Sequence, residues 1–128
     1  MKKIIDNIKT KRSIHYILII IIGLLVSIPL LKMQVASSDD GRFHLLRLIG
    51  LDNAFKYSSF PFLVFPFFCN DWGYSMTSFY PPIVTYLPYL LSFFTNNFAN
   101  ALKVFAMLTT IFSGIFMYNF VNEITKKK

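Results

Sequence analysis

The sequence predicts an all-α membrane protein, with about three transmembrane helices and an external loop that contains an amphipathic surface helix. Two features of composition favour this class: the 128 residues are 55% hydrophobic, and only 15% are charged. A soluble domain of this size needs many polar residues to cover its surface, and about 25% charged residues is typical. The net charge of +7 is the third observation. Its basic residues flank apolar runs, as membrane anchors do, instead of forming the polar face of a nucleic-acid binder.

The first apolar run predicts a spanning helix at residues 15–31. Residues 1–14 before it are basic and are expected in the cytoplasm, where Lys and Arg gather beside membrane spans. The run HYILIIIIGLLVSIPLL carries no formal charge and is just long enough to cross a bilayer. The alternative is a cleavable signal peptide with its cleavage site at Val35-Ala36-Ser37. Because a signal core usually has about 7–15 apolar residues, the length favours an uncleaved helix.

Residues 32–80 are expected to form an external loop with an amphipathic helix over about 38–57. Ser37 or Ser38, followed by Asp39 and Asp40, is typical of a helix start, since serine caps the helix and acidic residues suit its first turn. Such a helix would lie along the membrane surface. Its expected apolar side is Leu45, Leu48, Ile49 and Phe55, and its expected polar side is Asp40, His44 and Arg47.

The rest of the loop is aromatic and contains prolines. Residues 60–69, FPFLVFPFFC, are too few to span as a helix, and proline breaks regular helix. We therefore expect an interfacial or re-entrant segment packed against other protein. Cys69, the one cysteine, cannot form an internal disulfide and is expected to be a buried, inert thiol. Five aromatic residues further on are typical of membrane-interface anchors: Trp72, Tyr74, Tyr80, Tyr86 and Tyr89.

Two more apolar runs complete the predicted membrane domain. Residues 81–95 begin with two prolines, which suit a helix start, and are expected to form a transmembrane or re-entrant helix. Residues 98–121 are expected to form a third transmembrane helix, in which Lys103 snorkels to the interface. Three spans leave the basic tail at 122–128 outside, although its lysines favour the inside. A re-entrant 81–95 is the alternative that removes this conflict.

The acidic pair at the start of the surface helix is the candidate catalytic site. Asp39 and Asp40 together could hold a hard divalent cation such as Mg²⁺ or Mn²⁺, or one of them could act as a general base. His44 lies one turn beyond Asp40 and could pair with it, and Arg47 could hold a phosphate with its planar fork of donors. The alternative is that these residues only complement the helix dipole and form a solvated face.

Four motifs, read in order, resemble a known family: SSDDGRFHLLRL at 37–48, FP at 60–61, WGY at 72–74 and SFYPP at 78–82. Together they resemble the opening of large bacterial multi-spanning proteins labelled 6-pyruvoyl-tetrahydropterin synthase-related. Those proteins look like members of the GT-C superfamily of glycosyltransferases, which use polyprenyl-phosphate-linked sugars. The resemblance covers residues 10–122.

The resemblance implies a role for each matching residue. In GT-C enzymes an acidic residue just after the first helix is the catalytic or metal-associated carboxylate, and Asp40, with Asp39 beside it, matches that position. His44 and Arg47 match the His and Arg of the loop helix, and the aromatic positions before the second helix fall on two more candidate substrate-binding residues, Tyr74 and Tyr80. The family pattern often has His-Asp where this chain has Asp39-Asp40.

The sequence therefore predicts the N-terminal part, or a truncated relative, of a GT-C-like glycosyltransferase in the bacterial inner membrane. Its N-terminus would be cytoplasmic. Three helices and a loop do not position both a lipid-phosphate donor and an acceptor, so we expect no activity from this part alone. The expected partners are the bilayer, a polyprenyl-phosphate sugar, and further helices or a membrane subunit, with no nucleic acid. The alternatives are a small non-catalytic membrane subunit and a lipid-associated module released by cleavage of the first helix.

Overall fold

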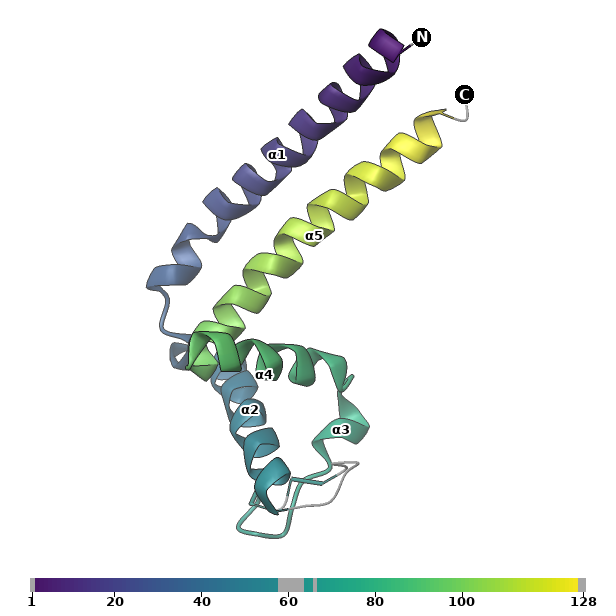
Figure 1. Cartoon of the computed structure of the whole chain (residues 1–128). Helices are drawn as coiled ribbons and strands as arrows, with labels where there is room; N and C mark the ends of the chain where they lie inside the picture. The colour runs from purple at the N-terminus through teal and green to yellow at the C-terminus, as the bar shows by residue number, and fades with distance from the viewer. Residues whose placement is uncertain (1, 58–63, 66, 127–128) are drawn as a thin grey trace. The chain divides into compact units, whose positions relative to one another are not determined.

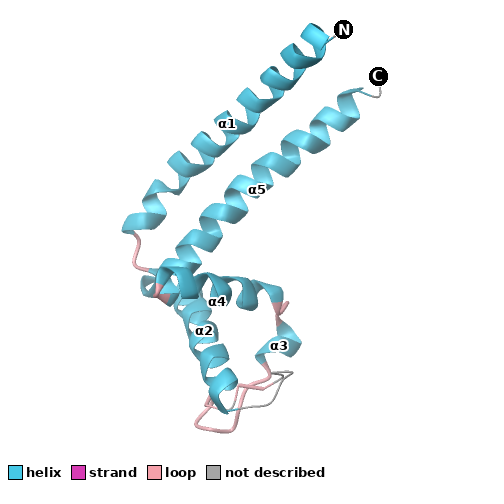
Figure 2. Ribbon diagram, in the orientation of Figure 1, coloured by secondary structure: helices cyan, strands magenta, loops and turns pink. Residues whose placement is uncertain are grey.

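The computed structural model describes residues 2–57, 64–65 and 67–126, and over these residues the chain is all-helical (Figure 2). The predicted all-α class is confirmed. The helices in chain order are α1 (Lys2–Lys32), α2 (Asp39–Tyr57), α3 (Met76–Phe79), α4 (Ile83–Thr95) and α5 (Phe98–Lys126), with a short 3-10 turn at Val35–Ser37 between α1 and α2 (Figure 1).

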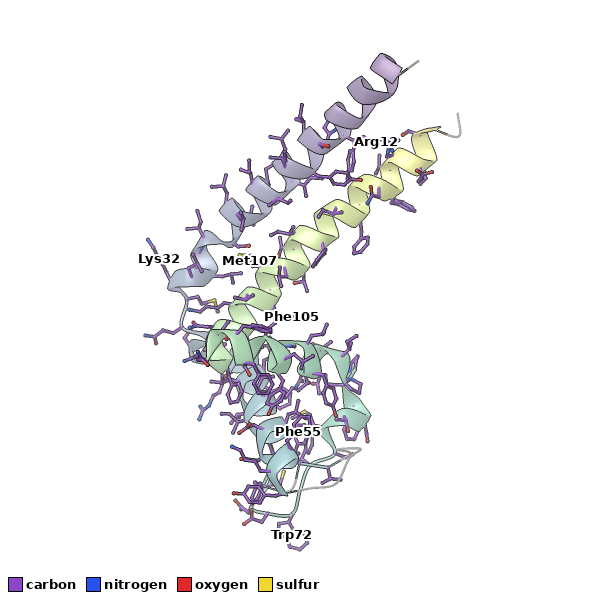
Figure 3. All side chains as sticks on the ribbon, viewed as in Figure 1. Arg12, Lys32, Phe55, Trp72, Phe105 and Met107 are labelled. Carbon is purple, nitrogen blue, oxygen red and sulfur yellow. The ribbon has the colours of Figure 1, made fainter. Side chains whose placement is uncertain are left out.

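The prediction of about three transmembrane helices is wrong, because the described residues contain two helices long and apolar enough to cross a membrane. These candidate spans are Arg12–Lys32 and Phe98–Thr125. Both ends of the first span, Arg12 and Lys32, are labelled in Figure 3. The expected span at 81–95 is the 13-residue helix α4. At 1.5 Å per residue, α4 is about 20 Å long, which is shorter than the hydrocarbon core of about 30 Å.

The chain divides into two compact units. The hairpin unit consists of Met1–Lys32 and Ala106–Lys128, and the middle unit consists of Met33–Phe105. In the hairpin unit, α1 already begins at Lys2, so residues 2–14 of the expected basic segment are helical and continue into the predicted span. The two helices of this unit lie side by side, and both chain ends lie at the same end of it (Figure 1).

Glycines bring the two helices of the hairpin unit close together. A Cβ on Gly23 would lie 2.7 Å from Cγ1 of Ile111, and a Cβ on Gly114 would lie 2.8 Å from Cγ2 of Ile19. Small residues allow this approach between apolar helices in a membrane. The buried hydroxyl of Ser27 donates to the Gly23 carbonyl at 2.7 Å, so it carries no unsatisfied polar group into the contact.

Two polar contacts set the register of the hairpin unit near the chain ends. The Tyr16 hydroxyl donates to Oδ1 of Asn119 at 2.6 Å. The Tyr118 hydroxyl lies 3.1 Å from Nδ1 of His15. Further along α1, Ile19 and then Gly23 make the glycine contacts. Their partners on α5, Gly114 and then Ile111, come in descending order. The helices are therefore antiparallel.

The middle unit begins with a capped helix. The backbone N–H of Gly41 donates to Oγ of Ser38 at 3.1 Å, so Ser38, of the two serines expected, provides the cap at the start of α2. Gly41 is needed here, because a Cβ at this position would collide with the carbonyl oxygen of Val35. The helix covers Asp39–Tyr57, where the sequence predicts one over 38–57.

The buried face of α2 differs from the expected apolar side. Leu48 is buried as predicted, but Ile49 is 40% exposed and Phe55 is 48% exposed. The helix is turned so that Gly50 faces the rings of Phe65 and Phe68. A Cβ on Gly50 would collide with both rings. The core of the unit joins α2 to the loop, α3 and α4, and consists of Leu48, Leu51, Ala54, Phe65, Met76 and Tyr89.

The loop between α2 and α3 is described at 64–65 and from 67 onward. Residues 60–63 and 66 of the expected interfacial segment lie outside the described residues. Backbone hydrogen bonds in both directions join Phe65 and Tyr74 at 2.9 and 3.1 Å. Between them, the consecutive residues Cys69, Asn70 and Asp71 have left-handed φ angles of 57°, 56° and 67°. The Cys69 thiol is exposed, so the expectation of a buried thiol is wrong: the turn directs this part of the loop to solvent.

Candidate functional site

The candidate catalytic carboxylates lie at the exposed start of α2. Asp39 and Asp40 occupy its first turn, and both residues are exposed. Among the described residues, neither forms an ion pair. The described part of the chain also contains no group of three or more His, Cys, Asp or Glu residues that could hold a metal ion. A divalent cation at this pair would therefore need ligands from water, from a substrate or from other protein.

Arg47 lies between two aromatic rings instead of on the polar surface. Its residue is 3% exposed, and the expectation of a solvated position is wrong. The guanidinium carbon is 4.3 Å from the ring centroid of Phe43 and 3.5 Å from that of Tyr80. Contacts of this kind attract a cation through the negative ring face. The carbon chain and charge of Arg47 thus take part in packing α2 against the segment before α4.

His44 links Arg47 to the acidic turn. Its Nδ1 lies 3.3 Å from Nη1 of Arg47, and because arginine only donates, His44 accepts with an unprotonated nitrogen. Burial lowers the pKa of His44 and the charge of Arg47 lowers it further, whereas Asp40 opposes both effects. The buried Nε of Arg47 has no hydrogen-bond partner among the described residues.

The structure brings four of the six predicted site residues into one cluster: Asp40, His44, Arg47 and Tyr80. Asp39 precedes this cluster at the exposed helix start. Tyr74 has another environment, since its backbone pairs with Phe65 and its ring stacks on Phe79 at 6.0 Å. Phe43 belongs to the cluster and was missed. Its position four residues before Arg47 on a helix is the signal that could have found it.

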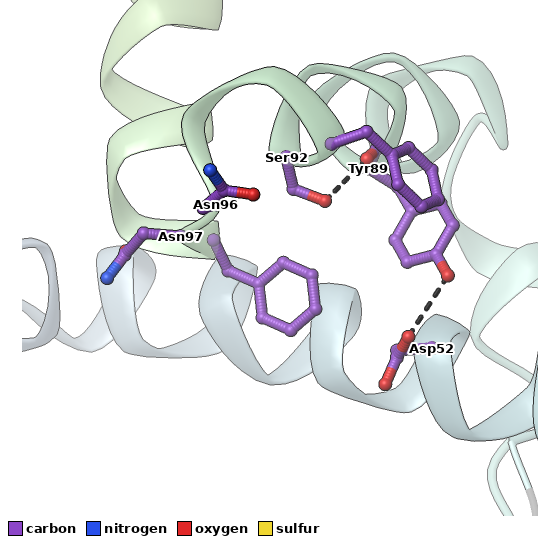
Figure 4. A pocket seen from close by; sticks show the side chains of 7 residues that line it. Asp52, Tyr89, Ser92, Asn96 and Asn97 are labelled. Carbon is purple, nitrogen blue, oxygen red and sulfur yellow. Dashed lines mark hydrogen bonds between the residues drawn. The ribbon is translucent and has the colours of Figure 1, made fainter.

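A second polar site, which was not predicted, lies between α2, α4 and the start of α5. It is a shallow pocket of about 280 Å³ whose lining residues are Asp52, Tyr89, Ser92, Phe93, Asn96, Asn97 and Phe98 (Figure 4). The Tyr89 hydroxyl donates to Oδ1 of Asp52 at 3.0 Å. Lys56 donates to Oδ2 of the same carboxylate at 2.6 Å. The i, i+4 spacing of Asp52 and Lys56 was a sequence signal for this ion pair.

The environment of Tyr89 makes its hydroxyl hard to ionise. Burial is the main cause, followed by the hydrogen bond to Asp52 and the charge of that carboxylate, and together they raise the pKa of Tyr89 to about 12. The ring is stacked on Phe55 at a centroid distance of 5.2 Å. Tyr89, expected as a membrane-interface anchor, is therefore a core residue whose polar end is fixed by Asp52.

Comparison with known proteins gives one similarity that covers most of the chain. A protein of Lactococcus lactis subsp. cremoris (strain MG1363), described as an uncharacterized protein, is 25% identical over 122 residues, which is 95% of this chain. The chain spans only 20% of the length of that relative. No family model matches the chain, and no solved structure matches it.

Proposed function

We propose that this chain is a two-span membrane module with both ends in the cytoplasm and the middle unit on the outer face of a bacterial inner membrane. The observation that carries the proposal is that the two long helices expose their apolar side chains. Only 11% of the 18-residue apolar stretch in α1, and 6% of that in α5, is buried. The core helix of a soluble protein would bury such a window, whereas a helix surrounded by lipid exposes apolar side chains on every face.

The positions of the basic residues support this orientation. Five Lys and Arg residues precede the apolar part of α1, and three lysines end the sequence. Because α1 and α5 are antiparallel, both basic ends belong on one side of the membrane. The positive-inside rule then places both in the cytoplasm. The three-span prediction satisfied this rule at only one end.

The middle unit would then present Asp39 and Asp40 to the outer face, seven residues after the end of α1. In a larger GT-C-like glycosyltransferase that uses a polyprenyl-phosphate-linked sugar, Asp40 would activate an acceptor hydroxyl or, with Asp39, hold Mg²⁺ or Mn²⁺. Three points support this function: the resemblance of the loop motifs, the exposure of both carboxylates, and the similarity of the chain to one fifth of a longer protein. Further helices would complete the site.

Asp40 and Arg47 differ in how easily a substrate could reach them. Asp40 is exposed and needs no rearrangement to meet an acceptor. Arg47 is enclosed by Phe43 and Tyr80, so a lipid-linked phosphate reaches its guanidinium only if the ring of Tyr80 moves. Tyr80, which is 40% exposed, would then control access of the phosphate.

The test replaces Asp40 by Asn in the gene as it stands in its own cell and compares the sugar composition of the cell envelope. The matched control is Asp71→Asn, another exposed acid of the middle unit. Loss of a sugar modification with Asp40→Asn alone supports the catalytic assignment. An unchanged envelope in both strains, at normal protein level, contradicts it.

A non-catalytic membrane subunit is the second candidate function. The enclosure of Arg47 favours it, because the residue best suited to bind a phosphate already serves in packing. In this case Asp40→Asn leaves the envelope sugars unchanged, and capture of the protein from its membranes in mild detergent brings down a larger membrane protein. The same capture from the Asp40→Asn strain then recovers that partner in equal amount.

A further inference from the structure

Helix α4 exposes its apolar face and buries its polar one. The buried residues are Thr85, Pro88, Tyr89 and Ser92. On the opposite face, residues at i, i+4, i+7 and i+11 form an apolar stripe, namely Ile83, Leu87, Leu90 and Phe94, which are 62%, 43%, 55% and 85% exposed. A surface helix of a soluble protein has the reverse arrangement. The apolar stripe therefore requires an explanation in terms of its surroundings.

Specific contacts fix this rotation of α4. The Tyr89 hydroxyl donates to Oδ1 of Asp52 on α2 at 3.0 Å. The Ser92 hydroxyl is satisfied within α4, since it donates to the Tyr89 carbonyl at 2.6 Å. The ring of Tyr89 is stacked between Phe55 and Phe98, at centroid distances of 5.2 and 6.2 Å. Turning the helix to bury the apolar stripe would break the contacts of Tyr89 with Asp52, Phe55 and Phe98 and expose the core side of Tyr89. The outward direction of the apolar stripe is thus a property of the folded middle unit.

The position of α4 in the chain indicates what covers the apolar stripe. The helix is too short to cross a bilayer, and only Asn96 and Asn97 separate it from α5, the second candidate span. Asn96 ends α4 with a left-handed φ of 51°, and Oδ1 of Asn97 accepts from the backbone N–H groups of Ala99 and Asn100 at the start of α5. Two capping residues are thus all that separates α4 from the second candidate span.

We propose that α4 is an in-plane membrane helix, whose apolar stripe inserts into the boundary between headgroups and acyl chains of the outer leaflet. An amphipathic helix in this position buries its apolar face about 5–10 Å into the boundary. The lipid surface suits a stripe without a charged residue. This inference rests on the proposed crossing of the membrane by α1 and α5, and it is separate from the assignment of Asp40.

The test is a spin-label accessibility measurement on the full chain in phosphatidylcholine–phosphatidylglycerol vesicles. Single nitroxides are attached to Leu87→Cys and Leu90→Cys in a Cys69→Ser background. Ile22→Cys, at a 58% exposed position of the first span, reports the membrane crossing. Arg42→Cys, at an exposed charged position of α2, reports the aqueous phase. Collisions with oxygen, which dissolves in lipid, are compared with those of a water-soluble nickel chelate.

The proposal predicts that both α4 labels collide more with oxygen than with nickel, at a depth shallower than that of the Ile22 label. If the two α4 labels are as accessible to nickel as the Arg42 label, the docking of α4 is overturned. If the Ile22 label still faces lipid in that case, the membrane crossing stands. Protection of the α4 labels from both reagents also overturns it, since a second copy or a partner protein would then cover the apolar stripe. Nickel access at Ile22 contradicts the crossing itself and, with it, the docking.

Discussion

The guanidinium carbon of Arg47 lies 3.5 Å from the ring centroid of Tyr80. This contact joins the middle of α2 to the residue before the two prolines that lead into α4. It is made by a cation with 3% of its surface exposed, which among the described residues has no carboxylate in ion-pair range. The two aromatic rings around it are therefore the main source of compensation for its lost hydration.

Removing the ring of Tyr80 should destabilise the middle unit. For Tyr80→Ala we expect a loss of about 1–2 kcal/mol, the scale of a desolvated cation–π contact, and a lower thermal midpoint of the full chain in detergent. Tyr80→Phe is the matched control, since it keeps the ring face and changes only the hydroxyl. Equal melting of the alanine and phenylalanine variants would show that the ring contributes nothing to holding Arg47.

The stability of the middle unit should fall in mild acid because of His44. Its folded pKa is lowered, mainly by burial and then by Arg47, so the folded state favours the neutral ring. The contribution of His44 is complete above its unfolded pKa of about 6.5 and is lost as pH falls through the lower folded pKa. Thermal midpoints measured between pH 7.5 and 5 should decrease less in His44→Gln than in the unchanged protein.

Asp40 provides an independent check on this electrostatic link. Because Asp40 opposes the lowering of the His44 pKa, Asp40→Asn should lower that pKa further, whereas Asp71→Asn should leave it unchanged. The titration can be followed by NMR of the His44 ring in the full chain. An unchanged His44 pKa in Asp40→Asn would show that the charge of Asp40 does not act on the His44–Arg47 pair.

The hydroxyl of Tyr89 should titrate well above the ordinary pKa of a tyrosine. Its pKa is raised to about 12 by burial and by Asp52, so its stabilising contribution is present below its unfolded pKa of about 10 and is lost as pH rises through about 12. Tyrosinate absorbance near 295 nm should show a late ionisation step that Tyr89→Phe removes. A late step that survives this substitution would assign it to another tyrosine.

A large side chain at Gly23 should separate the helices of the hairpin unit. Even a Cβ would lie 2.7 Å from Ile111, so Gly23→Leu should cost about 1–3 kcal/mol through overpacking and lower the thermal midpoint. Val26→Leu, at a position of the same helix that is 64% exposed, is the control and should melt as the unchanged protein does. A similar decrease for both variants would contradict the contact between Gly23 and Ile111.

The parts of the fold that depend on neighbouring residues could be predicted from the sequence. A serine at 37 or 38 and the acidic residues after it marked the start of α2, and continuous apolar runs marked the two candidate spans. The environment of Arg47 could not be predicted, because it depends on Tyr80, 33 residues away in the chain. Its position on the helix indicated a polar face, and only the tertiary contact reverses that inference.

The same limit applies to α4. Hydropathy identified an apolar helix at 81–95, but a spanning helix and an in-plane helix have similar composition. The difference lies in the helix length, set by the break at Asn96-Asn97, and in the burial of Tyr89 and Ser92 against the middle unit. Likewise, the apolar neighbours of Cys69 predicted burial, whereas a run of left-handed residues places its thiol in solvent.

The most direct test of the account uses the native cysteine to determine the side of the middle unit. Intact spheroplasts that make the full chain are treated with a membrane-impermeant maleimide, before and after permeabilisation. In the unchanged protein we expect Cys69, which is exposed, to react without permeabilisation. In Cys69→Ser with Thr125→Cys, at an exposed position near the end of α5, we expect reaction only after permeabilisation. Reaction of both cysteines from the same side would contradict a two-span module with an external middle unit.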